Sequence, residues 1–347
     1  MHAILKHTQI LFLIFPLLLS ACAPQDRYIR IEGYAQGGTY SVTCNVKGVS
    51  LPAEAIRDGV DSLLTLIDTT LSGYNKGSLL SRFNRGERIV PNALFLDTYA
   101  LARHWWEASD GALDCAAGPL FDAWGFGFKQ GSFPSDDQIR EILAGCGMKR
   151  LPADLRNVIA SDGTLSQEEC PGSLNYNAIA QGLSCDIIAR WLYGLGVKDM
   201  LVDIGEIYCD GLNPSRKGWT VGVDRPVDGN DTPGAELSAI WSSGGGPSGV
   251  VTSGNYRKFY ILDGKKYAHT VDPRSGVPVS HSLLSATIIA PDAATADAVA
   301  TWCMVIGLEE ARELILARGE FEGLLIYDDG GMMAQWNSPG FTVQTPQ

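Results

Sequence analysis

The sequence predicts an α+β fold in which an antiparallel or mixed β-sheet carries flanking helices. Helical and strand patterns do not alternate regularly along the chain, as they would in a fold built from βαβ units. Asp-Gly and Gly-Gly pairs, which favour hairpins, recur between the helices. The 347 residues are 45% hydrophobic and 19% charged, which is typical of a globular protein with a substantial core.

The N-terminus has the pattern of a secretory signal. Lys6 gives it a weakly basic start, and the apolar run Ile10–Leu19 is too short to span a bilayer. Leu19-Ser20-Ala21-Cys22 then resembles a bacterial lipobox, in which the cysteine is lipidated after cleavage; an ordinary signal peptide with a chance cysteine is the alternative. We therefore expect a signal peptide at residues 1–21, a lipidated tether at 22–27 and one functional domain at 28–347. This arrangement predicts a lipid-anchored protein of the bacterial cell envelope, on the periplasmic side of a membrane.

Charge and cysteine usage disfavour two kinds of site. Residues 1–21 contain one lysine and no acid, so their removal leaves 26 basic and 39 acidic residues, a balance of −13. Such a chain lacks the basic footprint of a nucleic-acid-binding protein. The seven cysteines after Cys22 include no CxxC pair, which disfavours a cysteine zinc site. Cys146 and Cys170 are a candidate disulfide, and buried free thiols are the alternative.

In the first half, alternating residues predict a hairpin of Tyr28–Gly37 and Thr39–Val46 around Gly37-Gly38. The aromatic residues of Gly118–Gly127 are expected to pack in the core. Asp162-Gly163 predicts a second hairpin, with Leu155–Ala160 and Gly163–Leu165 as its arms. Helical spacing of apolar residues predicts three helices and one short helical turn: Pro52–Ser72, Asn92–Ser109, Ser135–Gly145 and Leu79–Phe83.

In the second half, helical spacing covers Ser184–Leu195 and Glu309–Arg318. Turns are expected at Ser242–Gly249 and at Asp263-Gly264. Runs rich in β-branched and aromatic residues predict the strands Met200–Ile204, Trp219–Val223, Leu237–Trp241, Gly249–Ser253, Lys258–Leu262, Ser285–Ala290, Gly323–Tyr327 and Met332–Trp336. The last two of these strands form a hairpin.

The segment Pro291–Thr301 reads as the opening of a helix. Asp292 is a good N-cap, because its carboxylate can accept from free N–H groups of the first turn. Asp297 and Thr301 are four residues apart and therefore lie on one helix face. A carboxylate and a hydroxyl form a pair of hard oxygen donors, which Mg²⁺ or Ca²⁺ prefers. The alternative is a solvated Asp297 beside a core-facing Thr301.

A second segment, Asn175–Gly182, is expected to link a strand to a helix that starts near Leu183. Its small residues would let a ligand approach the backbone, and a helix N-terminus favours anions. The segment lacks the spacing of a Walker loop or a dinucleotide-binding fingerprint.

Seven motifs follow one another between about Gly37 and Trp336. They are Gly38-Thr39-Tyr40; Ser81-Arg82-Phe83-Asn84; Gly111–Asp114 with Gly118-Pro119 and Trp124–Gly127; Asn177–Gly182 with Asp186; Thr252–Arg257; His269–Gly276; and Ala296–Thr301. In this order they resemble the ApbE family of FAD:protein FMN transferases, and the resemblance covers nearly the whole chain after the signal.

The resemblance implies a function and a set of site residues. FAD would be the substrate and Mg²⁺ the metal, and FMN would pass to a threonine or serine hydroxyl of a partner flavoprotein subunit in a membrane electron-transport complex. The implied metal ligands are the Ala178 carbonyl and the side chains of Asp297 and Thr301. His269 lies beside the flavin loop and is a candidate for contacting phosphate or moving a proton, with a structural histidine as the alternative. The implied FAD contacts are Gly37, Tyr74, Ala112, Leu113, Asp114, Asn175, Gln181 and Val271.

This chain departs from the family pattern at four places. The family usually has methionine at Gly37, aspartate at Asn175 and lysine or glutamate at Gln181. The segment Val202–Glu206 also lacks one glycine of the usual pair. Asn175 can hydrogen-bond but cannot act as a base. These departures keep two other functions open: an FAD-binding lipoprotein without transfer, and an Mg²⁺-dependent FAD pyrophosphatase.

Overall fold

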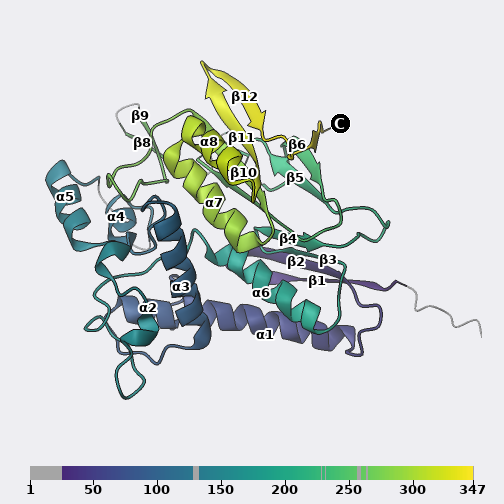
Figure 1. The fold of residues 1–347 in the computed structure, drawn as a ribbon, viewed down its shortest axis with the longest axis horizontal. Helices are drawn as coiled ribbons and strands as arrows, with labels where there is room; N and C mark the ends of the chain where they lie inside the picture. The colour runs from purple at the N-terminus through teal and green to yellow at the C-terminus, as the bar shows by residue number, and fades with distance from the viewer. Residues whose placement is uncertain are drawn as a thin grey trace, which may run out of the picture.

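The computed structural model describes residues 26–127, 133–227, 229–230, 232–255, 259–262 and 265–346. Its largest element is an eight-stranded sheet in the order β1-β2-β3-β4-β7-β10-β11-β12. Every neighbouring pair in this sheet is antiparallel. Helices flank the sheet, so the predicted α+β fold class is confirmed (Figure 1).

The strands of this sheet are β1 (Tyr28–Ala35), β2 (Gly38–Asn45), β3 (Met200–Asp203), β4 (Ile207–Asp210), β7 (Ser248–Gly254), β10 (Leu283–Ala290), β11 (Glu322–Asp329) and β12 (Met332–Asn337). A three-stranded sheet holds β5 (Thr220–Asp224), β6 (Leu237–Ser242) and β13 (Val343–Gln344). The hairpin of β8 (Phe259–Leu262) and β9 (Lys265–Ala268) stands apart from both sheets.

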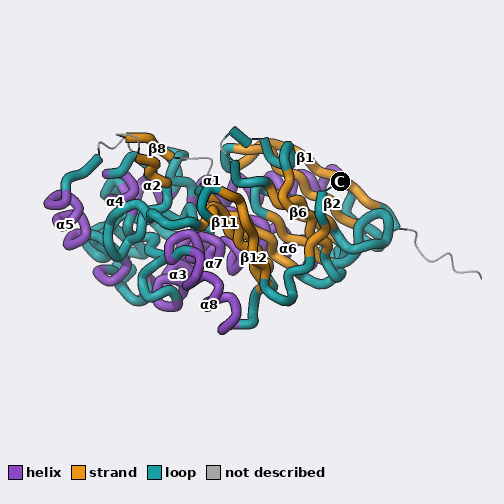
Figure 2. The backbone as a smooth tube through the Cα atoms, turned by 90° about the horizontal axis from the view of Figure 1, so that it is seen from above, coloured by secondary structure: helices purple, strands orange, loops and turns teal. Residues whose placement is uncertain are grey.

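The helices are α1 (Ala53–Leu71), α2 (Leu79–Asn84), α3 (Ala93–Ala108), α4 (Gly118–Ala123), α5 (Asp136–Gly145), α6 (Ala180–Gly194), α7 (Ala293–Ile306) and α8 (Leu308–Arg318). Two short 3-10 helices lie at Met148–Arg150 and Leu155–Asn157. Figure 2 shows α3, α4 and α5 gathered at one end of the molecule, with β1 and β2 at the other.

The central strands β10 and β11 of the large sheet are buried on both faces. Neighbouring residues of a strand point to opposite sides and so enter different clusters. Val251 and Leu325 join the cluster that packs under α7 and α8, whereas Val250 and Leu324 join the cluster under the three-stranded sheet. Helices α1 and α6 cover the β1–β4 end through a third cluster, which includes Val42. The sheet therefore lies between a layer of helices and a second, smaller sheet.

Helix α7 is the most enclosed helix of the core. Its sequence is apolar on nearly all sides, which is typical of a helix surrounded by protein. It packs against α6, α8, β7 and β10 (Figure 1). Asp292 caps it as predicted, since its Oδ1 accepts the N–H of Thr295 at 2.8 Å.

Several sequence predictions are wrong in detail. The hairpin at Asp162-Gly163 does not form: Leu155–Asn157 is a 3-10 helix, and Leu165 instead makes an isolated bridge to Ile89. Burial explains why the predicted arms do not pair. The side chains of Leu155 and Leu165 are both fully buried in the core cluster that packs under α7 and α8. The turn itself exists, since Asp162 accepts the N–H of Thr164.

Three further corrections concern the segment before Asn175, the start of α6 and strand β4. The residues directly before Asn175 form no strand. Helix α6 begins at Ala180, earlier than the predicted start near Leu183. Strand β4 was not predicted, because its short run around Tyr208 follows β3 after a tight turn. Cys146 and Cys170 are both buried free thiols, which is the second of the two alternatives that the sequence left open.

Some predicted features fall outside the described residues. The turn at Asp263-Gly264 and the start of its strand at Lys258 are among these, as are the signal peptide and Cys22. Within the part of the chain that the structure describes, no helix has the length and apolar character needed to cross a membrane.

Candidate active site

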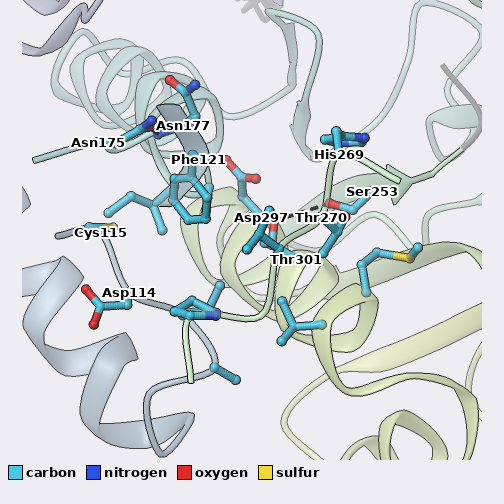
Figure 3. Close-up of a pocket in the computed structure, with 18 of the residues that line it drawn as sticks. Asp114, Cys115, Phe121, Asn175, Asn177, Ser253, His269, Thr270, Asp297 and Thr301 are labelled. Carbon is cyan, nitrogen blue, oxygen red and sulfur yellow. Dashed lines mark hydrogen bonds between the residues drawn. The ribbon is translucent and has the colours of Figure 1, made fainter. Parts of the chain in front are cut away.

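A cavity of about 380 Å³ lies between α7 and the segment that runs from the end of α3 through α4. Most of its walls come from five segments that are distant in sequence: residues 112–115, 175–181, 252–254, 269–273 and 297–305. Figure 3 shows Asp297, Thr301, Ser253 and His269 on one side of this space and Asn175 and Asp114 on the other.

The carboxylate of Asp297 is the most deeply placed acid of the cavity. The residue is 4% exposed, and its Oδ2 accepts the backbone N–H of Gly182 at 3.0 Å. Thr301 follows one helical turn later and lines the same wall, with its Oγ1 3.4 Å from the Ser253 hydroxyl. The i, i+4 spacing thus places both oxygen donors toward one space.

Burial raises the pKa of Asp297 to about 7, and the nearby acid Asp186 adds to the shift. The hydrogen bond from Gly182 acts in the opposite direction and only partly offsets it. A buried carboxylate with one N–H donor is poorly stabilised in its charged form, and a cation would correct this. Ala178 lines the same cavity from the loop before α6.

These three residues therefore fit a hard divalent cation. All three residues line the cavity, and their oxygens are a carboxylate, a hydroxyl and a backbone carbonyl, which are donors of the kind that Mg²⁺ accepts. The described residues hold no cluster of three or more His, Cys, Asp or Glu side chains suited to a metal. A site of the type used by zinc or by several carboxylates is thus not formed by the part of the chain described, and phosphate or water would have to complete the coordination.

Hydrogen bonds of Asn175 fix the conformation of the loop before α6. Asn175 is buried, donates its N–H to the Cys115 carbonyl at 2.7 Å, and accepts the N–H of Asn177 on its Oδ1 at 3.0 Å. These bonds fold the chain so that Ala178 and Ile179 reach the cavity wall. The side-chain oxygen that an aspartate would supply is present here without the negative charge.

Gln181 also lines the cavity, but its amide is bonded to another segment. Its Nε2 donates to the Ile204 carbonyl at 3.2 Å, and it lies against Gly205, where an added Cβ would stand 2.9 Å from the same nitrogen. Two of the departures from the family pattern therefore meet, since Gln181 contacts the loop that lacks one glycine. Glu206 of that loop also lines the cavity.

The opposite wall contains Ala112, Leu113 and Asp114. Asp114 accepts the N–H of Ala116 at 2.8 Å and that of Met148 at 3.0 Å. Burial raises the pKa of Asp114, and these two bonds only partly counter it. Its carboxylate is thus built into the wall, where it fixes the backbone of the segment that faces the cavity.

His269 and Val271 line the third side. The His269 ring packs edge-on against Phe126, with 6.4 Å between ring centroids. Phe121 and Phe126 also line the cavity, so two of the aromatic residues expected in the core instead face this space. The glycines around them in the Gly118–Gly127 segment were the signal that could have marked a binding surface.

Two predicted contacts do not line this cavity. Tyr74 is 65% exposed beyond the end of α1, where its hydroxyl accepts from Nδ2 of Asn177 at 3.4 Å. Gly37 sits at the tip of the β1–β2 hairpin with a φ of +84°. The preceding Gln36 reaches from this tip to α6, where its Nε2 donates to the Ser184 hydroxyl at 2.6 Å. Both Tyr74 and Gly37 thus lie near residues 177–184, which border the cavity, but neither lines it.

Comparison with known proteins agrees with this architecture. The ApbE family model matches residues 37–325. The FAD:protein FMN transferase of Escherichia coli K12 is 31% identical over 322 residues, which cover 90% of this chain and 87% of that protein. The protein of the same name from Haemophilus influenzae is 30% identical and covers 93% of each chain.

Solved structures show the same similarity in three dimensions. The apo form of the Pseudomonas stutzeri flavinyl transferase ApbE superposes with a TM-score of 0.76 at 29% identity, over 91% of this chain and 96% of that one. The flavin transferase ApbE of Vibrio cholerae gives a TM-score of 0.75 at 27% identity, over 91% and 99% of the two chains.

The fold, the cavity and these relatives define an enzyme of the transferase class. Within that class, the chain belongs to the ApbE family.

Proposed function

We propose that this protein transfers FMN from FAD to a threonine or serine hydroxyl of a partner protein in an Mg²⁺-dependent reaction that releases AMP. The observation that carries the proposal is the shared cavity: Ala178, Asp297 and Thr301 meet there with the predicted FAD contacts Ala112, Leu113, Asp114, Asn175, Gln181 and Val271. The relatives' names supply the reaction type.

The bond changes define what the site must do. The acceptor oxygen forms a bond to the FMN phosphorus, the pyrophosphate bond to the AMP phosphate breaks, and AMP leaves with the bridging oxygen. Mg²⁺, when bound, would supply positive charge to the phosphate oxygens. The chain's own part is to hold the dinucleotide between Asp114 and α7 and to orient the hydroxyl, which lowers the entropic part of the barrier.

We assign His269 the role of general base, which accepts the proton of the acceptor hydroxyl. It lines the same cavity as Asp297 and is fixed from one side by Phe126. Imidazole changes charge near neutral pH, which suits it to accept a proton as the new bond forms. Asp297 is the less suitable base, because its carboxylate is assigned to the cation.

The partner is proposed to be a flavoprotein subunit of a membrane electron-transport complex. This proposal builds on the resemblance of Leu19–Cys22 to a lipobox. A lipid on Cys22 would hold the enzyme at the periplasmic side of a membrane. The acidic balance of the chain is consistent with a protein rather than a nucleic-acid acceptor.

The function is tested by incubating the full chain with FAD and MgCl₂, with and without a candidate acceptor, while AMP release and acceptor mass are followed. Transfer predicts AMP only with acceptor, together with an added FMN on the acceptor. AMP without acceptor would identify a pyrophosphatase, and FAD binding without AMP would identify a carrier. Either of these outcomes would replace the proposal.

A further inference from the structure

The first turn of α7 is held by a carboxylate from another helix. Asp186, in the second turn of α6, accepts the N–H of Ala293 on Oδ1 and that of Ala294 on Oδ2, each at 2.8 Å. The residue is 9% exposed. The first N–H groups of a helix have no partner inside the helix, and here two of them are satisfied by a residue more than 100 positions away in sequence.

The same two helices meet at a second point one helical turn earlier. A Cβ on Gly182 would stand 2.2 Å from the Ala293 carbonyl oxygen, so the backbones are in direct contact there. The N–H of Gly182 then donates to Asp297, as described above. On the other side of α7, a Cβ on Gly249 of β7 would stand 2.4 Å from Ala293 Cα. The start of α7 is therefore enclosed by backbone from two directions.

These contacts connect the two halves of the predicted metal site. Ala178 lies two residues before α6, and Asp297 and Thr301 lie on α7. The distance between the Ala178 carbonyl and the two side chains thus depends on how α6 and α7 are placed.

On the basis of the proposed function, we propose that Asp186 is a positioning residue for the metal site. Its carboxylate fixes α7 against α6 and so sets the spacing between the Ala178 carbonyl and the side chains of Asp297 and Thr301.

The chemistry of the contact requires a carboxylate. Both oxygens of Asp186 accept, whereas an asparagine would turn its NH₂ group toward one of the two N–H donors. The negative charge also lies at the positive end of α7, where it is favourable. A ligand phosphate is consequently not expected at this helix terminus, since the two N–H groups that would bind it are already used.

A second carboxylate at the same terminus provides a matched control. Asp292 accepts from the N–H and the hydroxyl of Thr295, at 2.8 and 2.9 Å, within α7 itself. It stabilises the helix end locally, so its loss should affect stability without moving α7 relative to α6.

The test compares Asp186→Asn and Asp292→Ala with the wild-type full chain. Titration calorimetry with MgCl₂ in the presence of FAD measures metal affinity directly, and steady-state assays measure the Mg²⁺ concentration for half-maximal FMN transfer. We expect Asp186→Asn to weaken Mg²⁺ binding at least tenfold, with most of the maximal rate recovered at saturating Mg²⁺. Asp292→Ala should lower the thermal midpoint while Mg²⁺ affinity stays within twofold of wild type.

The opposite pattern would overturn the proposal: an Asp186→Asn protein that is less stable but binds Mg²⁺ as the control does. Should that variant not fold, Asp186→Glu is the second variant. It keeps both acceptor oxygens but lengthens the side chain by one methylene group, which displaces α7. Unchanged Mg²⁺ affinity in Asp186→Glu would also overturn the proposal. Mg²⁺ binding that depends on Asp186 without any FMN transfer would remove the proposed function and leave the positioning role. A wild-type protein that binds no Mg²⁺ would remove both.

Discussion

Replacing Gly182 with alanine probes the contact between α6 and α7 most directly. The new methyl group would stand 2.2 Å from the Ala293 carbonyl oxygen and 2.9 Å from the Ala294 nitrogen. Ordinary contacts of this kind are about 3.5 Å, so the helices must separate by roughly 1 Å. The obstacle is backbone, which cannot rotate away as a side chain would.

The energetic cost has three parts. Overpacking of a dense core costs about 1–3 kcal/mol. Lengthening the Gly182 N–H bond to Asp297 removes a hydrogen bond to a buried acid, at about 1.5–3 kcal/mol. The better helix propensity of alanine returns about 1 kcal/mol. We therefore expect Gly182→Ala to lose about 1.5–5 kcal/mol of unfolding free energy.

The assay is urea unfolding followed by circular dichroism, with Gly194→Ala as the control. Gly194 is the last residue of the same helix, is exposed, and has open space where its Cβ would lie. Its replacement should be neutral or stabilising by about 0.5–1 kcal/mol. Equal unfolding free energies for the two variants would refute the close-contact argument.

Three further predictions follow from individual groups. Asp297→Ala should abolish Mg²⁺-dependent AMP release while the circular dichroism spectrum is retained, and normal turnover in it would contradict the metal assignment. Mg²⁺ affinity, measured by calorimetry, should rise between pH 6 and 8, because the pKa of Asp297 is about 7 and the cation must displace its proton; a flat profile would contradict this. Burial acts against ionisation of Asp199, but bonds from Leu212, Asn45 and Arg216 lower its pKa overall. Asp199→Asn should therefore cost about 1–2 kcal/mol at pH 7, with the difference vanishing as the pH falls through that lowered pKa; a pH-independent loss would exclude the charge as its cause.

The elements with long, regular patterns were predictable from the sequence. Helix α1 and the capped start of α7 lie where the apolar spacing and Asp292 placed them. The start of α6 was missed because the helix begins directly after the loop that Asn175 shapes, and Gly182 in its first turn gave no helical signal. Short elements were also missed where burial, rather than local pattern, decides the conformation, as at Leu155.

The placement of Asp297 and Thr301 on one helix face was predictable, but the contacts that hold their helix in position were not. The spacing of Asp297 and Thr301 is local, so a helix model suffices to place them on one face. The role of Asp186 depends on a crossing of two helices separated by more than 100 residues, which no local pattern encodes. Gly37 and Tyr74, inferred from resemblance alone, lie outside the cavity walls.

Most of the cavity's walls come from five stretches between residues 112 and 305. A chain that ends before α7 would lack the wall formed by residues 297–305. A bound dinucleotide would therefore contact parts of the chain that are far apart in sequence. By mass action such a ligand raises the stability of the whole domain rather than of one loop.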